Sequence, residues 1–119
     1  MSDDLTLLHN PRCSTSRFAA DTVAAAEVPV KVVEYLKHPL TAQQLHDLIS
    51  VLEDEPGDLV RRDATFSQLG LTENDVSDTD KIVALLVEHP RLMQRPVLIR
   101  SGRAIIGRPK SRVQPFLQA

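Results

Sequence analysis

The stretch that decides the fold is residues 5–35, which read LTLLHNPRCSTSRFAADTVAAAEVPVKVVEY. Residues 5–8 are an apolar run that predicts a short buried strand, and Asn-Pro at 10–11 ends it. The alanine-rich segment from 14 to about 27 predicts a helix. The β-branched, alternating residues 30–35 predict a second strand. The order strand, helix, strand is that of a βαβ unit, in which the two strands run parallel.

The rest of the chain predicts a helical region followed by a β-hairpin. Residues 41–52 start with capping-box spacing and then carry leucine and isoleucine at helical intervals. Residues 57–71 predict short helical turns, and acidic caps precede a helix over 81–88. A Ser-Gly turn within 97–106 predicts the hairpin, and 111–117 predict a last short helix. The complete order is that of a thioredoxin-like fold.

These elements predict an α/β fold class: a thioredoxin-like, small mixed four-stranded sheet with flanking helices and a helical insertion. We expect a single domain over residues 1–119, with the helical insert at about 41–90. The composition, 42% hydrophobic and 25% charged, is ordinary for a globular domain of this length. In the first helix, Phe18, Val23 and Ala26 are available for an inner face.

The net charge and the apolar content of the chain argue against nucleic-acid and membrane partners. The formal net charge of −2 argues against a nucleic-acid binder that works through bulk basicity. The longest aliphatic stretch, 82–87, is far shorter than the about 20 residues that cross a bilayer. The first four residues, MSDD, are acidic where a signal peptide is basic, and the chain has one cysteine. We therefore expect a cytoplasmic monomer with no nucleic-acid and no membrane partner.

The one cysteine, Cys13, lies where the first predicted strand meets the first predicted helix. Backbone N–H groups at a helix start stabilise an anion by about 0.3–1 kcal/mol, and neighbouring cations lower a thiol pKa further. Ser14, Thr15 and Ser16 add hydroxyl and amide donors around this point. Free cysteines are also used as small buried hydrophobes. The polar neighbours Arg12 and Ser14 favour a thiolate nucleophile that faces an anion-binding nest.

Three arginines stand in unusual sequence positions and are candidates to bind a tetrahedral oxyanion. Arg61 lies in the helical insert, Arg95 directly precedes Pro96, and Arg108 directly precedes Pro109. A guanidinium group suits such an anion because it donates planar, paired hydrogen bonds. The alternative for each of them is a solvated surface arginine. Two further arginines are assigned that surface role: Arg62 and Arg91.

Pro96 opens the third predicted strand, and a thioredoxin-like layout places this residue opposite the reactive cysteine. A cis peptide bond before proline is found at only about 5–6% of such bonds, but this position raises the expectation of one. The turn would direct Arg95 toward the thiolate.

His9 lies four residues before Cys13, where the first strand ends at Asn10. A His–Cys metal pair lacks further ligands at a suitable spacing, so no metal site is predicted. His9 as a base or hydrogen-bond partner that tunes the thiol, and His9 as a structural residue, both stay open. We assign supporting roles to His9, Asn10 and Pro96.

Several segments together resemble the glutaredoxin-coupled arsenate reductases. Residues 9–17, HNPRCSTSR, resemble the active-site loop of that family. Residues 59–63, LVRRD, with 68–71, QLGL, resemble its helical-insert motif. Residues 89–97, HPRLMQRPV, resemble the start of its third strand, and 107–109, GRP, its closing motif. The match is collinear and covers nearly the whole chain.

The resemblance implies an oxidoreductase that reduces arsenate, or a similar oxyanion, to arsenite. Cys13 would be the nucleophile that forms a thiol-arsenate adduct, and Arg61, Arg95 and Arg108 would hold the oxyanion. Glutathione would attack as co-substrate, arsenite would leave, and glutaredoxin would resolve the mixed disulfide. No bound cofactor is implied. An external thiol suits a chain that has no second cysteine.

The residues that follow Cys13 also bear on three other functional classes. The phosphatase-like arsenate reductases need an arginine six positions after the cysteine, where this chain has Ala19, and are excluded. Redox regulators that resemble the Spx transcription factors carry a Cys-x-x-Cys switch, and Ser16 occupies the second position here. A glutathione-dependent thiol oxidoreductase with another substrate and a non-enzymatic Spx-like redox regulator both stay open as alternatives.

Overall fold

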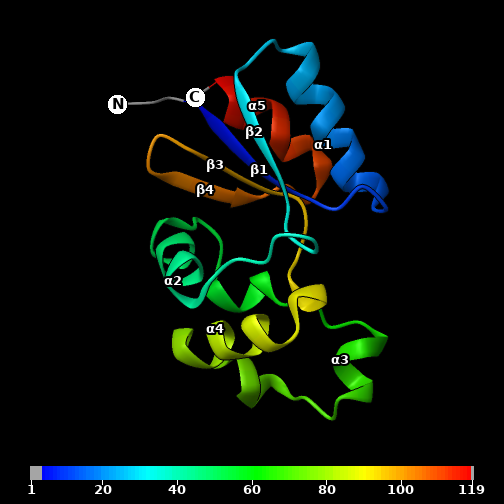
Figure 1. The fold of residues 1–119 in the computed structure, drawn as a ribbon, viewed down its shortest axis with the longest axis vertical. Coiled ribbons are helices and arrows are strands. Elements are labelled where there is room, and N and C mark those ends of the chain that lie inside the picture. Colours follow the sequence, from blue (N-terminus) through cyan, green and yellow to red (C-terminus); the bar gives the residue numbers. More distant parts are fainter. Residues whose placement is uncertain (1–3, 119) are drawn as a thin grey trace.

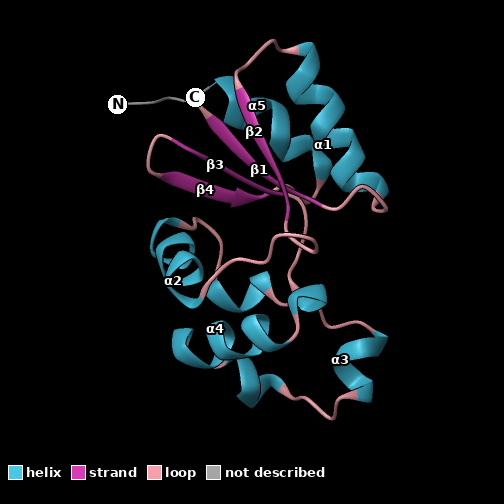
Figure 2. Cartoon of the chain, in the orientation of Figure 1, coloured by secondary structure: helices cyan, strands magenta, loops and turns pink. Residues whose placement is uncertain are grey.

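A single four-stranded mixed sheet organises the computed structural model, which describes residues 4–118 (Figure 2). The strand order is β2-β1-β3-β4. β1 (Leu5–His9) runs parallel to β2 (Val30–Glu34) and antiparallel to β3 (Val97–Arg100), which pairs antiparallel with β4 (Arg103–Ile106). The predicted four-stranded mixed sheet with a parallel βαβ unit is therefore confirmed.

Helices cover both faces of this sheet, as Figure 1 shows. α1 (Ser14–Ala25) and α5 (Val113–Gln118) pack together on one face. The helices of the insert lie on the other side: α2 (Ala42–Val51), α3 (Ala64–Gln68) and α4 (Thr79–Glu88). Short 3-10 turns complete the connections at Pro56–Leu59, Glu73–Val76, Pro90–Leu92 and Lys110–Arg112.

Two hydrophobic clusters hold these layers together, one on each face. Leu5 and Leu7 of β1 belong to the cluster beneath α1 and α5, whereas Leu8 belongs to the cluster that the insert covers. Successive side chains of a strand point to opposite faces, so both faces of β1 are buried. This explains why β1 is a continuous apolar run instead of an alternating one.

The buried face of α1 differs from the predicted one. Val23 is buried as expected, but Phe18 is 41% exposed and Ala26 is exposed. The inner face is made by Ser16, Ala19 and Val23, which are spaced by three and four residues as one face of a helix requires. The prediction was therefore wrong for Phe18, which lies off this face, and for Ala26, which is the C-cap after the last residue of α1.

The predicted turn signals are found where they were expected. Thr41 forms a capping box with Gln44 at the start of α2. The hairpin turn has φ +53° at Ser101 and +73° at Gly102, so both central residues are in the left-handed region that a tight hairpin needs. The second strand ends at Glu34, one residue earlier than predicted.

Gly107 follows β4 and packs closely against the start of β3. A Cβ atom there would lie 2.8 Å from Pro96 Cγ and 3.1 Å from Leu98 Cδ1. We expect Gly107→Ala to lower the free energy of unfolding by about 1–3 kcal/mol, because the proline ring has to move. Denaturant unfolding measures this. Gly57→Ala is the control, since its Cβ would meet ordinary contacts at 3.5 Å; an equal loss in both variants would contradict the steric explanation.

Candidate active site

The loop between β1 and α1 places Cys13 at the N-cap position of α1. Asn10 shapes this loop from inside: its backbone oxygen accepts from Cys13 N at 3.0 Å, and its Oδ1 accepts from Arg12 N at 2.9 Å. Asn10 is itself buried, so the turn is held against the core. The half-buried cysteine therefore lies at the carboxyl end of β1, where α/β folds place their chemistry.

Cationic and N–H groups surround the sulfur of Cys13. Arg108 Nη2 donates to the sulfur at 3.3 Å. Burial raises the pKa of the Cys13 thiol, but hydrogen bonding from the Ser16 N–H, the Arg95 side chain and the Thr15 N–H, with the charge of Arg108, outweighs burial and lowers the pKa overall. The site thus favours the thiolate, which is the nucleophilic form.

We expect the pKa of the Cys13 thiol to lie clearly below the ordinary value of about 8.5. A titration that follows the ultraviolet absorbance of the thiolate measures it, with Cys13→Ser as the blank. The same titration in denaturant should return the ordinary value, because the helix start and the guanidinium groups no longer meet the sulfur. Equal values in the folded and unfolded protein would contradict the assignment of a stabilised thiolate.

Arg95 and Arg108 flank the open end of the β3–β4 hairpin, where Val97 pairs with Ile106, and both act on the sulfur. The Arg95–Pro96 peptide bond is cis, as expected, and the Arg108–Pro109 bond is also cis, which the sequence analysis did not predict. Arg108 Nε donates to the backbone oxygen of Arg95 at 2.7 Å. This hydrogen bond joins the two arginine-bearing segments beside Cys13.

Arg61, the third predicted arginine, is placed differently. Its Nε donates to Asp63 Oδ2 at 3.3 Å, and its backbone N donates to Leu92 O at 2.7 Å. Arg61 is not among the groups that shift the pKa of the Cys13 thiol, but its charge does act on Tyr35. Arg61 thus borders the site without a direct contact to the sulfur among the described residues.

Arg62 is exposed, as predicted, but it is not merely solvated. It forms an ion pair with Glu73 at 3.0 Å and donates to the backbone oxygens of Gly57 and Val60. Arg62 therefore connects the 3-10 turn at Pro56–Leu59 with the one at Glu73–Val76.

His9 acts on Ser16 and not directly on the cysteine. His9 Nδ1 lies 2.7 Å from Ser16 Oγ, which also accepts from Asn10 N at 3.0 Å. Burial lowers the pKa of His9, the charge of Glu34 opposes this and Arg17 adds a smaller lowering, so the ring favours its neutral form, which can share a hydrogen bond with the Ser16 hydroxyl. The hydroxyl predicted to face the anion is thus used within the loop, and the backbone N–H of Ser16 faces the sulfur. Ser14 is exposed and Thr15 is half-buried.

Tyr35 is a residue of this centre that the sequence analysis missed. It directly follows β2 and is only 1% exposed. Its hydroxyl lies near enough to Arg95, Cys13 and Arg61 for each of them to affect its pKa. One signal was available: residues that end two neighbouring parallel strands meet at the same edge of the sheet.

The chain is similar to known proteins over nearly its whole length. Residues 8–116 match the model of the ArsC family. The chain belongs to the ArsC family. It is 31% identical over 116 residues to the arsenate reductase of Neisseria meningitidis, covering 96% of this chain and 98% of the relative. It is 28% identical to an arsenate reductase of Escherichia coli, covering 97% of this chain and 82% of the relative. The structure "Arsenate reductase from Vibrio cholerae" superposes with a TM-score of 0.83 at 26% identity, covering 97% and 98% of the two chains.

The predicted resemblance is therefore confirmed at the level of the family and of the thioredoxin-like fold. The residues that surround the sulfur of this ArsC-family chain, from His9 to Arg108, all lie within the matched region. Within residues 4–118, no helix combines the length and the apolar character needed to cross a bilayer. In the same part of the chain, no three His, Cys, Asp or Glu side chains come together as metal ligands.

A polar hollow of about 430 Å³ adjoins Arg108 on the side of the helical insert. Asp54, Asp58 and Gln94 line it together with Arg62 and Arg108. Because Arg108 also contacts the sulfur, the hollow offers space for a polar group beside the reactive centre of the ArsC-family fold.

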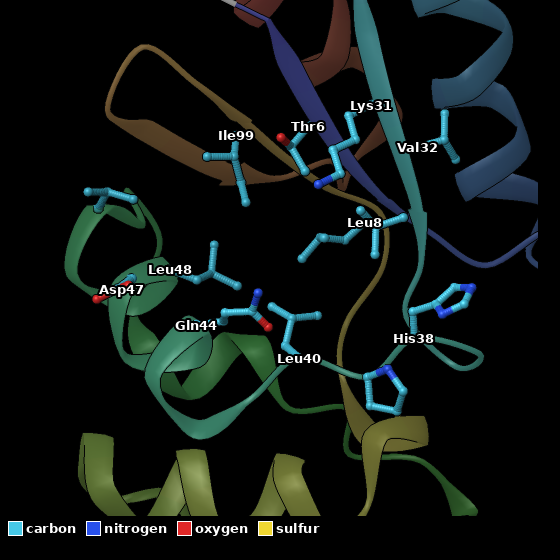
Figure 3. Close-up of a pocket in the computed structure, with 13 residues that line it drawn as sticks. Thr6, Leu8, Lys31, Val32, His38, Leu40, Gln44, Asp47, Leu48 and Ile99 are labelled. Carbon is cyan, nitrogen blue, oxygen red and sulfur yellow. The ribbon is translucent and has the colours of Figure 1, made fainter. Parts of the chain in front are cut away.

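A larger groove of about 730 Å³ lies away from this chemistry, between the sheet and α2 (Figure 3). Leu8 and Ile99 on the strands face Leu48 and Leu40 across it, and Lys31 projects from β2 at its rim. None of the described residues that line it contacts the sulfur of Cys13. The volume of a hollow therefore does not identify the reactive site here; the charges around the thiol do.

Proposed function

We propose that this protein reduces arsenate to arsenite through the Cys13 thiolate, with glutathione and glutaredoxin as the reductants. The observation that carries the proposal is a cysteine at the start of a helix with Arg108 at 3.3 Å from its sulfur and Arg95 beside it, which lower its pKa. Relatives named arsenate reductase match nearly the whole chain, which supports arsenate as the substrate.

The first step is a substitution at arsenic. The Cys13 thiolate attacks the arsenic of dihydrogen arsenate, a sulfur–arsenic bond forms, and an arsenic–oxygen bond breaks. The oxygen leaves as hydroxide and takes a proton from solvent, so the oxidation state of arsenic does not change. The guanidinium groups of Arg95 and Arg108 hold the arsenate oxygens with charge-assisted hydrogen bonds. The N–H groups at the start of α1 stabilise the same negative charge.

The second step is the reduction. A glutathione thiolate attacks Sγ of Cys13, a sulfur–sulfur bond forms, and the sulfur–arsenic bond breaks. Its electron pair stays on arsenic, so As(V) becomes As(III) and leaves as arsenite, while two thiols are oxidised to a disulfide. A glutaredoxin thiolate then takes the glutathionyl group and restores Cys13.

An assay that couples glutaredoxin and glutathione reductase to NADPH oxidation tests the proposal. We expect NADPH oxidation that depends on arsenate, on glutathione, on glutaredoxin and on this protein. Phosphate in place of arsenate is the control for the redox step, because it has the same shape and is not reduced. A rate no higher than that without the protein would refute the proposed activity.

A further inference from the structure

Tyr35 lies beside the reactive loop because of the register of the two parallel strands. Glu34, the last residue of β2, is paired with His9, the last residue of β1. Tyr35, which directly follows Glu34 after the end of β2, therefore lies beside the loop that carries Cys13. The Tyr35 ring is packed into the cluster on the insert side, and the residue is only 1% exposed.

The hydroxyl of Tyr35 is buried, and no hydrogen bond of ordinary geometry satisfies it among the described residues, although the Arg95 side chain lies close enough to lower its pKa. A buried hydroxyl without a partner is unfavourable, and packed cores seldom keep one. Nε of Arg95 is a second buried polar atom with no hydrogen-bond partner among the described residues. Arg95 acts on the Tyr35 hydroxyl and also on the sulfur of Cys13, so all three groups adjoin one centre.

The Tyr35 hydroxyl is protonated at neutral pH and can therefore donate a hydrogen bond. Burial raises the pKa of Tyr35 above its ordinary value, and the negative charge of Cys13 adds to this rise. The charges of Arg95 and Arg61 and a hydrogen bond from the Arg95 side chain act in the opposite direction without reversing it. The pKa of Cys13 is lowered and that of Tyr35 is raised, so the two values are shifted apart and the phenol stays protonated.

We propose that the Tyr35 hydroxyl donates a hydrogen bond to an oxygen of the oxyanion that Arg95 and Arg108 hold beside Cys13. This inference deepens the proposed function and rests on its oxyanion site. It adds a neutral donor from the end of β2 to the two guanidinium groups at the open end of the β3–β4 hairpin. Apart from the nucleophilic sulfur, these side chains are donors, which suits an oxyanion whose oxygens accept.

Tyr35→Phe tests the proposal, because it removes only the hydroxyl and keeps the ring that fills the core. We expect kcat/KM for arsenate to fall roughly tenfold to hundredfold, the range for one lost hydrogen bond to a charged group. The variant should be at least as stable as the parent, since it lacks an unpartnered buried hydroxyl. A structural role alone would instead lower stability together with activity, and that result would overturn the proposal.

A binding measurement separates this proposal from the proposed activity. Arsenate should protect Cys13 from alkylation by iodoacetamide. With the rate of each protein expressed relative to its own rate without arsenate, Tyr35→Phe should raise the half-protecting arsenate concentration roughly tenfold or more. Met93→Leu is the control, because Met93 is buried in the same cluster and carries no hydroxyl. Unchanged protection in Tyr35→Phe overturns the role of Tyr35. If protection depends on Tyr35 but the parent protein does not turn over arsenate, the proposed reductase activity is refuted and the role of Tyr35 in binding is kept.

The parent protein offers a second readout that needs no variant. The chain has one tyrosine and no tryptophan, so its intrinsic fluorescence comes from Tyr35. Addition of arsenate should change this fluorescence with the concentration dependence found by alkylation. A tyrosine signal that stays constant while arsenate protects Cys13 would overturn the proposal.

Discussion

Cys13→Ser is expected to reduce arsenate turnover to the background rate, a loss of about a thousandfold or more. A serine hydroxyl is protonated at neutral pH and is a poor nucleophile without a base to activate it. No other residue of the chain can replace the lost thiol, because there is no second cysteine. Initial rates in the coupled assay with arsenate, glutathione and glutaredoxin measure the effect.

The same substitution should leave the fold intact or strengthen it. Cys13 is the N-cap of α1, and its side chain makes no capping hydrogen bond. Serine is a preferred N-cap residue, and a good cap contributes about 0.5–2 kcal/mol. Denaturant unfolding of Cys13→Ser therefore serves as the control that separates lost chemistry from lost structure. Turnover close to that of the parent would remove Cys13 as the nucleophile.

Arg108→Ala is expected to produce the second largest loss, about a hundredfold to a thousandfold in kcat/KM for arsenate, as for other missing donors to a developing negative charge. Two contacts disappear together: the donation to the Cys13 sulfur at 3.3 Å and the hydrogen bond to the Arg95 backbone oxygen at 2.7 Å. The pKa of the Cys13 thiol should rise at the same time, because Arg108 is one of the charges that lower it.

Arg12→Ala is the matched control for Arg108→Ala. Arg12 is adjacent to Cys13 in the chain, but its side chain is exposed and is not among the groups that lower the pKa of the thiol. Exposed charges contribute little through solvent, so we expect a change in kcat/KM of less than about threefold. Equal losses in the two variants would assign the effect to overall positive charge and not to the contact at the sulfur.

Most of the reactive loop could be predicted because its features are local. The position of Cys13 at the start of a helix follows from residues close to it in the chain, whereas the cis bond before Pro96 is expected from the thioredoxin-like order of the elements. The role of Ser16 could not be predicted in the same way. Its hydroxyl faces His9 and Asn10 only because α1 packs against the end of β1, and this leaves the N–H to face the sulfur.

The amino-acid sequence alone determined the order of strands and helices, the caps, the hairpin turn and the cysteine at a helix start. These depend on side-chain spacing and backbone preference over a few residues. Only the tertiary structure decided that Arg108, 95 residues after Cys13, donates to its sulfur and that the Tyr35 hydroxyl adjoins the same centre. Such contacts depend on β3 pairing with β1 in the middle of the sheet and on the packing of both faces. Interactions between neighbouring residues do not specify that arrangement.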